Sequence, residues 1–267
     1  MAVPNTYDMD FYEPYRQPSV RTARAVVPLV REFVPIRSVC DVGCGDGGWL
    51  KIFLEAGVED VWGCDGGHIS PDILQFPAER FRAHDLRERF SMDRTFDLAM
   101  ANEVGHYLPE WRAASFVEDL TKLAPVVLFS AAIPRQGGGG ARHLNEQWPS
   151  YWADLFARFD FLTFDVLRPR LWDNPEVFRW VRQNQLLFCR RDAIPAKLAG
   201  WSSNAPLCIV HPEQFLGSRE DQDVAAALRG LGAAVLKGVR RPQLVRRLSR
   251  KMLRPLAKGV GTIRSFV

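Results

Sequence analysis

Two carboxylates, Asp41 and Asp65, each follow an apolar run in the first quarter of the sequence. Asp41 leads directly into a turn, VGCGDGG, in which Gly43, Gly45 and Gly48 match the spacing G-x-G-x-x-G. Glycines let a backbone bend sharply and approach a ligand closely, and free N–H groups at the start of a helix can donate hydrogen bonds. A strand, a glycine turn and a helix in this order predict a ligand-binding cradle.

The two acids indicate which ligand this cradle takes. The glycine spacing alone also fits a nicotinamide or flavin dinucleotide, but a carboxylate at Asp41 would repel a pyrophosphate. The same carboxylate suits an ammonium group, and Asp65 can accept hydrogen bonds from both hydroxyls of a ribose. A ligand with a ribose and a cationic amino-acid part, but no phosphate, is S-adenosylmethionine. The alternative is an ordinary strand–turn–helix that binds nothing.

The segments DVGCGDGGW and GCD resemble the first two motifs of class I S-adenosylmethionine-dependent methyltransferases. AHDL (83–86), FDLAMANEVGHYLPE (96–110) and VVLFSAAIP (126–134) follow in that family's order, so the resemblance spans about residues 20–190. It implies a methyltransferase that uses S-adenosyl-L-methionine. It also implies a set of cofactor-binding residues: Asp41, Gly43, Cys44, Gly45, Asp65, Gly66, Asp85, Leu86, Asn102 and Glu103. For Asp85 the alternative is a surface N-cap of the turn that follows it.

Three residues are candidates for handling the acceptor's proton, namely His143, His106 and Glu146. An imidazole has a pKa of about 6.5, so it can take a proton from a hydroxyl as the methyl group transfers. His143 is the preferred general base, and the alternative is that His143 and Glu146 only fix a loop to the next helix. His106 is the second candidate base, although a histidine there can also pack near the cofactor.

Two segments are candidate lids. Four successive glycines, 137–140, each carry a large ordering cost and form either a flexible surface link or a lid over the substrate. At the N-terminus we expect the first sixteen residues to dock on the surface, with Tyr7, Tyr12 and Tyr15 as the residues that could instead cover the cofactor.

Apolar runs alternate with helical patterns along the first 190 residues. This order predicts an α/β, Rossmann-like, seven-stranded and mostly parallel sheet with helices on both faces and an antiparallel, hairpin-like end. We expect strands near 37–42, 60–64, 80–84, 95–101, 125–131, 161–167 and 185–190. Helices are expected near 19–33, 47–56, 70–75, 111–123, 148–158 and 175–182. Ligands in such sheets bind at the carboxyl ends of the strands, where Asp41, Asp65, Asp85 and Asn102 fall.

The charge distribution divides the chain. From Arg229 onward there are eleven Lys and Arg and no Asp or Glu, so the remainder has 24 basic and 31 acidic residues, a net charge of −7. We expect a methyltransferase domain with an N-terminal helical lid at 1–192, a linker at 193–217 and a basic amphipathic helical tail at 218–267. Residues 240–267 suit an anionic membrane surface or a partner subunit. The acidic body argues against nucleic acid.

Composition bounds the remaining classes. Hydrophobic residues make up 47% of the chain, which is enough for a full core. Five cysteines without a C-x-x-C pair predict neither a disulfide framework nor a zinc site, and no other spacing demands a metal. The chain shows neither a signal peptide nor a run of apolar residues long enough to span a bilayer. We therefore expect a cytoplasmic protein, peripheral at the inner face of the membrane if the tail binds lipid.

The acceptor is indicated only by a second resemblance. HLNEQWPSYW (143–152) and LWDNPEVFRWVRQNQLLF (171–188) resemble segments of methyltransferases from bacterial glycan and natural-product gene clusters. This implies O-methylation of a sugar hydroxyl in a glycan or glycolipid. The alternatives are a small-molecule natural-product O- or N-methyltransferase, and a non-catalytic scaffold that docks through its basic tail.

Overall fold

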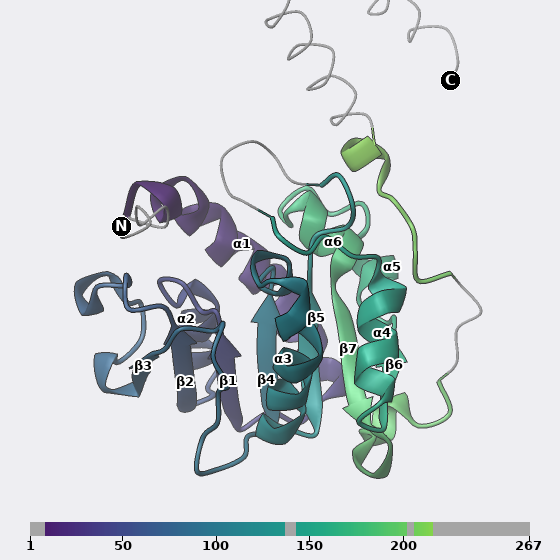
Figure 1. Ribbon diagram of the computed structural model, residues 1–267, viewed down its shortest axis with the longest axis horizontal. Coiled ribbons are helices and arrows are strands. Elements are labelled where there is room, and N and C mark those ends of the chain that lie inside the picture. Colours follow the sequence, from purple (N-terminus) through teal and green to yellow (C-terminus); the bar gives the residue numbers. More distant parts are fainter. Residues whose placement is uncertain (1–8, 137–142, 202–205, 216–267) are drawn as a thin grey trace, which may run out of the picture. The chain divides into compact units, whose positions relative to one another are not determined.

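The computed structural model describes residues 9–136, 143–201 and 206–215, which form a seven-stranded sheet with helices on both faces (Figure 1). The strand order is β3-β2-β1-β4-β5-β7-β6. β1 to β5 pair in parallel, whereas β7 is antiparallel to both β5 and β6. The bounds are β1 Ser38–Val42, β2 Asp60–Asp65, β3 Phe81–Ala83, β4 Leu98–Asn102, β5 Val126–Ser130, β6 Phe161–Phe164 and β7 Leu186–Arg190. The predicted sheet and its antiparallel end are confirmed.

Successive residues of each central strand enter two different cores, because side chains alternate between the faces of a sheet. Val39 lies in the core beneath α1 and α2, whereas Cys40 lies in the core beneath α3 and α4. β5 is buried along its whole length. The α-helices are α1 Met9–Phe33, α2 Gly48–Glu55, α3 Glu110–Leu123, α4 Pro149–Ala157, α5 Arg168–Leu171 and α6 Arg179–Asn184. Short 3-10 turns cover Pro71–Ile73, Ala78–Arg80, Gly105–Tyr107, Arg191–Ala193 and Ala196–Leu198.

Helix α1 is longer than its sequence predicts. It begins at Met9 rather than near residue 19 and contains Pro14, Pro18 and Pro28. The predicted start followed the apolar spacing of residues 19–33, and a proline in a helix interior costs about 3 kcal/mol. Burial offsets this cost, because a buried valine contributes about 1.5–3 kcal/mol. The buried stripe consists of Val20, Ala23, Val26, Val27 and Val30.

Part of the predicted linker is packed on the domain. Leu198 and His211 are buried, and the His211 N–H donates to Gln183 Oε1 at 2.7 Å. Arg182 also pairs with Glu213, at 2.5 Å. The described part of 193–217 therefore belongs to the folded domain, because its apolar and polar groups find partners there that a free linker would lack.

Other predictions fall outside the residues that the structure describes: Tyr7, the glycine run 137–140 and the tail 218–267. Among the helices at 9–136, 143–201 and 206–215, none combines the length and the hydropathy needed to cross a bilayer.

Candidate functional site

The glycine turn between β1 and α2 has the backbone shape that only glycine adopts easily. Gly43, Gly45 and Gly47 have φ angles of +88°, +54° and +79°. A Cβ on Gly43 would lie 2.3 Å from Cγ2 of Val104, which follows β4. The turn is thus held tightly against the end of the neighbouring strand.

The amides of Gly43, Cys44 and Gly45 in this turn already donate hydrogen bonds within the protein. The N–H groups of Gly43 and Cys44 donate to the carbonyl oxygen of Cys64 at 2.7 and 3.1 Å. The N–H of Gly45 donates to Asp65 Oδ2 at 2.7 Å. A pyrophosphate would need such donors for itself, so this arrangement disfavours a dinucleotide.

Asp41, at the end of β1, is a buried carboxylate that lacks a hydrogen-bond donor among the described residues. Asp41 is only 3% exposed. Burial, followed by the nearby charge of Asp65, raises the pKa of Asp41 to about 8. A cationic ligand group would remove this penalty, because an opposite charge favours the ionised carboxylate.

Asp65, at the end of β2, accepts from two backbone N–H groups, with Gly45 on Oδ2 and Gly66 on Oδ1 at 2.6 Å. Burial raises its pKa, while these two hydrogen bonds oppose the rise. Each carboxylate oxygen has a further lone pair, so ribose hydroxyls can still donate to it. Together, Asp41 and Asp65 fit the ammonium and ribose groups of S-adenosylmethionine. Gly66 contributes to this site through its backbone N–H, which holds the Asp65 carboxylate.

Two residues beside this cradle were not predicted. The His68 ring covers Gly66, where an added Cβ would lie 2.5 Å from His68 Nδ1. His68 Nε2 is 4.0 Å from Asp65 Oδ1, so a partial positive charge can approach the buried acid. Its only sequence signal is its place three residues after Asp65.

Asp46 was also missed, and it fixes α1 to the cradle. Its carboxylate accepts from the Gly48 N–H at 3.1 Å and from Gln75 Nε2 at 2.8 Å. Arg16 Nε of α1 lies 3.1 Å from Asp46 Oδ2. No local pattern links these residues, since Arg16 and Asp46 lie thirty positions apart in the chain.

Within the described part of the N-terminal segment, α1 packs on the domain at Tyr15. The Tyr15 ring packs against Phe178 and Trp180, with centroid distances of 6.3 and 6.4 Å. The Phe178 N–H donates to Thr22 Oγ1 at 3.0 Å. α1 therefore reaches from the glycine turn to the start of α6.

Asp85 has the alternative geometry foreseen for it. Its carboxylate is exposed and accepts from the Arg87 guanidinium at 2.5 Å and from the Arg87 N–H at 3.0 Å. The Arg87 hydrogen bond is the main cause of its lowered pKa. Leu86 is buried, and its carbonyl accepts from Arg112 Nε at 3.0 Å. An adenine contact by Asp85 and Leu86 stays a prediction.

Asn102 and Glu103, at the end of β4, direct their polar atoms toward the antiparallel half of the sheet. Asn102 Oδ1 accepts from Gln185 Nε2 at 2.9 Å. Glu103, with φ of +56°, accepts from Gln136 Nε2 at 3.3 Å and Asn184 Nδ2 at 3.4 Å. These contacts lie within the protein, and the predicted cofactor contact of Asn102 and Glu103 stays a prediction.

The environment of Glu103 is polar but uncharged. Burial raises its pKa to about 7, opposed by hydrogen bonds from Ser130, Asn184 and Gln136. None of these donors carries a charge. In the same cluster, Asn102 Nδ2 and Gln185 Oε1 are buried without a partner among the described residues.

His106 is not placed to act as a base, and this corrects one prediction. Its ring is buried, and Nδ1 accepts from the Ala132 N–H at 2.9 Å. The neutral ring then carries its proton on Nε2, so neither nitrogen has a free lone pair. Burial, with His143 nearby, lowers the His106 pKa well below its usual value. His106 instead ties the turn after β4 to the end of β5.

His143 and Glu146 form a hydrogen-bonded pair directly beside His106. His143 Nδ1 is 2.7 Å from Glu146 Oε1, and Glu146 Oε2 accepts from the Arg135 N–H at 2.7 Å. The His143 and His106 rings are 4.2 Å apart. With its proton on Nδ1, His143 keeps the lone pair of Nε2. Nε2 is then the proton-accepting atom of the pair.

The backbone holds this pair in place at the same edge as the cofactor acids. The N–H groups of Leu144 and Asn145 donate to the His106 carbonyl oxygen at 2.7 and 3.0 Å. The two halves of the site lie on neighbouring strands, because β1 pairs with β4. Fold and site thus define a Rossmann-like protein with a cradle for a cationic nucleoside beside a candidate proton acceptor.

Comparison with known proteins agrees with this class. The family described as "Methyltransferase domain" matches residues 14–171. The chain therefore belongs to this methyltransferase family, and it is a class I S-adenosylmethionine-dependent methyltransferase. The predicted cofactor and enzyme class are confirmed.

Solved structures share the fold at low sequence identity. The sugar N-methyltransferase KedS8 from a Streptoalloteichus species is 17% identical, with a TM-score of 0.52 over 72% of this chain and 99% of its own. An O-methyltransferase family protein from Burkholderia thailandensis is 15% identical, with a TM-score of 0.50 over 68% of this chain and 57% of its own. CalS10, an amino pentose methyltransferase from Micromonospora echinaspora, is 17% identical, with a TM-score of 0.49 over 71% of this chain and 100% of its own. No curated protein matches the sequence.

Proposed function

We propose that this methyltransferase O-methylates a sugar hydroxyl of a glycan or glycolipid, with His143 as the general base. The observation that carries the proposal is the contact between His143 Nδ1 and Glu146 Oε1 at 2.7 Å. A hydroxyl is a poor nucleophile until its proton is removed, so an oriented imidazole suits it. The resemblance of segments 143–152 and 171–188 to methyltransferases of glycan clusters indicates the sugar.

The chain's own residues divide the work. When bound, S-adenosylmethionine supplies a methyl group activated by a positively charged sulfur. Asp41 and Asp65 hold its ammonium and ribose groups. His143 Nε2 takes the hydroxyl proton, and Glu146 stabilises the imidazolium that forms. The Arg135 N–H keeps Glu146 in position through a 2.7 Å hydrogen bond.

Methylation of a sugar amine is the second candidate, and one observation favours it. The Glu103 carboxylate is surrounded by neutral donors, so the ammonium group of an amino sugar would be a suitable partner. KedS8, named as a sugar N-methyltransferase, shares the fold. Other small-molecule acceptors of natural-product type remain alternatives to both sugars.

The test separates the base from the cofactor site. The His143→Ala variant should bind S-adenosylmethionine with unchanged affinity by calorimetry, while kcat falls by about 100-fold or more. Leu144→Ala, an exposed neighbour in the same segment, is the matched control and should retain full turnover. Full activity of His143→Ala would show that His143 only fixes its loop. NMR of the product distinguishes an O-methyl from an N-methyl group.

The basic tail suggests where in the cell the enzyme acts. We propose that residues 240–267 hold the enzyme reversibly at an anionic membrane, at the cytoplasmic face. Each Lys or Arg near such a surface contributes about 1 kcal/mol. Full-length protein should sediment with phosphatidylserine vesicles at low salt, and a chain ending at residue 239 should not. Equal sedimentation of the two would favour a partner subunit as the target of the tail.

A further inference from the structure

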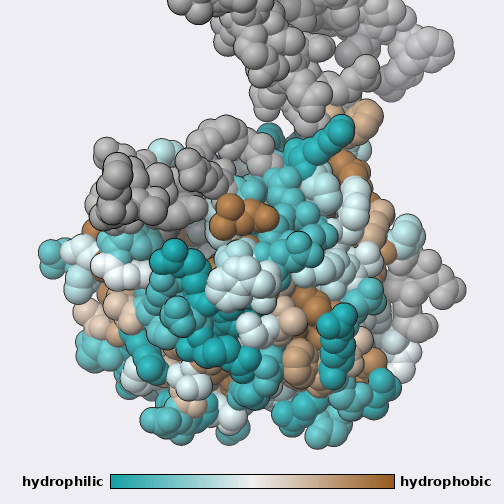
Figure 2. Space-filling view, viewed as in Figure 1, coloured by the Kyte–Doolittle hydropathy of each residue, from teal (hydrophilic) through white to brown (hydrophobic). Residues whose placement is uncertain are grey.

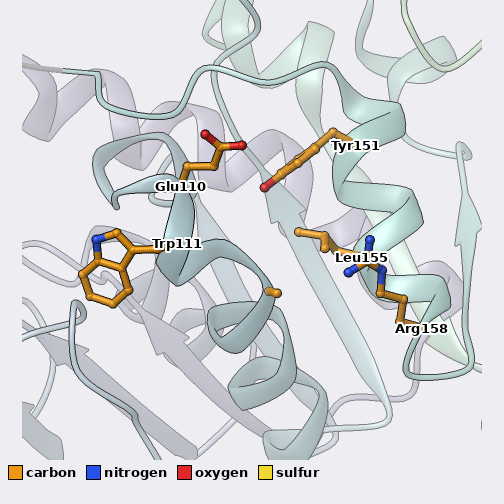
Figure 3. Close-up of a pocket in the computed structure, with 6 residues that line it drawn as sticks. Glu110, Trp111, Tyr151, Leu155 and Arg158 are labelled. Atoms are coloured by element: carbon orange, nitrogen blue, oxygen red, sulfur yellow. The ribbon is translucent and has the colours of Figure 1, made fainter.

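A groove of about 590 Å³ lies between α3 and α4, outside the cofactor cradle (Figure 3). It is lined by Glu110, Trp111 and Ala114 of α3, and by Tyr151, Leu155 and Arg158 at α4 and its end. Figure 3 shows Tyr151 projecting from α4 across the groove toward the start of α3, where Glu110 lies. The hollow is shallow and open to solvent, so a group bound in it would keep one face in water.

The groove opens next to the candidate base. α3 begins at Glu110, four residues after His106, and α4 begins directly after the segment that carries His143. In a parallel α/β sheet, such helix starts lie at the edge where ligands bind. The amide of Asn145 lies close enough to Tyr151 to act on its pKa, although burial is the larger effect and raises it. One end of the groove therefore adjoins the acceptor site.

The other end lies further along the helices. Tyr151 and Arg158 are seven residues apart, which is about 10 Å along a helix. Arg158 is exposed, and Leu155 is buried between them. The groove thus runs away from the reacting atoms, where a small acceptor would not reach.

The lining suits a neutral sugar ring. A pyranose has apolar C–H faces and a rim of hydroxyls, so it needs an aromatic or aliphatic wall with both acceptors and donors around it. Tyr151 and Leu155 supply the wall. The Glu110 carboxylate accepts hydrogen bonds, and the Arg158 guanidinium donates them. Glu110 and Arg158 carry opposite charges, so the groove gives neither an anion nor a cation an advantage over a neutral group.

The surrounding surface argues against a protein partner. Figure 2 shows this face as mostly hydrophilic, with hydrophobic residues confined to small separate patches. The centres of protein interfaces are depleted of charged residues, yet Glu110 and Arg158 are both exposed at this groove. Trp111, 72% exposed at the rim, is the one large exposed aromatic side chain that lines it.

We propose that the α3–α4 groove is a subsite for a second, neutral sugar unit of an oligosaccharide acceptor. This inference rests on the proposed methylation of a sugar. It places the methylated unit at His143 and the next unit against Tyr151, so the enzyme would prefer a chain of sugars to a single one.

Kinetics on paired acceptors test the subsite. The probes are linear tetrasaccharides of glucose, mannose, galactose and rhamnose, each paired with its methyl monoglycoside. For the tetrasaccharide that the enzyme accepts as a substrate, Arg158→Ala and Trp111→Ala should raise KM about 10-fold. The kcat and the KM for the monoglycoside should be unchanged. Asp154→Ala, an exposed change on α4 outside the groove, should alter neither. Equal KM values in the wild type and both variants would overturn the inference while leaving sugar methylation standing.

Binding without turnover separates the two proposals. Saturation-transfer NMR on full-length protein, without S-adenosylmethionine, should detect contacts to the tetrasaccharide that Arg158→Ala weakens. If that contact appears but no sugar is methylated, the proposed function fails, and the groove is then a sugar-binding surface but not a subsite for a methyl acceptor. If no tetrasaccharide binds, the groove proposal is wrong. Dissociation of a dimer by Trp111→Ala, seen by sedimentation, would also overturn it, because a second copy would then occupy the groove.

Discussion

The two halves of the site are built in different ways. At the ends of β1 and β2, Asp41 is a buried carboxylate and Asp65 a partly buried one, and the donors to Asp65 are backbone amides. At the ends of β4 and β5, by contrast, side chains bond to one another across long stretches of sequence. Asn102 reaches Gln185 over 83 residues, and Glu103 reaches Asn184 over 81.

This difference indicates how each half recognises its ligand. Burial raises the pKa of Asp41 to about 8, so this carboxyl group is largely protonated at neutral pH, and a cation beside it would favour its ionised form. The cluster at the end of β4 combines amides with the Glu103 carboxylate, and we propose that it contacts the acceptor mainly through its shape and its hydrogen bonds. If cofactor binding depends on charge and acceptor binding on shape, substitutions in the two halves should affect the two ligands separately.

The largest expected effect is on the cofactor half. Asp65→Ala should weaken S-adenosylmethionine binding by about 100-fold or more, because removing an acceptor of charged hydrogen bonds costs about 3 kcal/mol and 1.4 kcal/mol is tenfold. Calorimetry measures the affinity. Asp65→Asn keeps one acceptor for Gly45 and controls for collapse of the turn. Unchanged affinity in Asp65→Ala would show that the ribose binds elsewhere.

The next effect concerns the acceptor half. Glu146→Gln should lower kcat by roughly 10-fold or more, because a glutamine amide can donate to His143 Nδ1 and so favour the tautomer that cannot accept a proton. Glu146→Ala should lower kcat less, since it leaves the tautomer free. Cofactor affinity should stay constant in both variants. A larger loss with alanine than with glutamine would mean that Glu146 matters for loop structure alone.

Sequence could predict the cofactor half because its contacts are local. Asp41 and the glycines belong to one turn, and Asp65 follows the very next strand. Most of the strands could also be predicted, because they are buried apolar runs, whereas the short β3 is mostly exposed. The role of His106 could not be predicted from sequence, because the Ala132 N–H donates to its Nδ1 only once β5 has packed beside β4. The Arg16–Asp46 pair and the early start of α1 could not be predicted either, because they depend on packing between distant segments.

Asp41→Asn should weaken cofactor binding by about 10-fold and change the pH dependence of stability. The folded pKa of Asp41 is about 8, above its unfolded value of about 3.9, so folding takes up a proton between these values. Stability of the ligand-free protein should therefore fall as pH rises from about 4 to about 8. Asn removes this contribution, while Asp65 and Glu103 keep contributions of the same sign. Thermal unfolding at pH 6 and pH 9 measures it, and an equal drop in both proteins would contradict it.

The smallest expected effect decides to which half Glu103 belongs. Glu103→Gln keeps the shape but removes the charge, so it should leave S-adenosylmethionine affinity unchanged and alter acceptor KM only a few-fold for a sugar hydroxyl. With an amino sugar the loss should be larger, because the charge-assisted hydrogen bond disappears. Since the pKa of Glu103 is about 7, a charged role would also make wild-type KM for an amino sugar fall as pH rises through 7. A loss of cofactor affinity in Glu103→Gln would instead return this residue to the cofactor half and contradict the division by charge and shape.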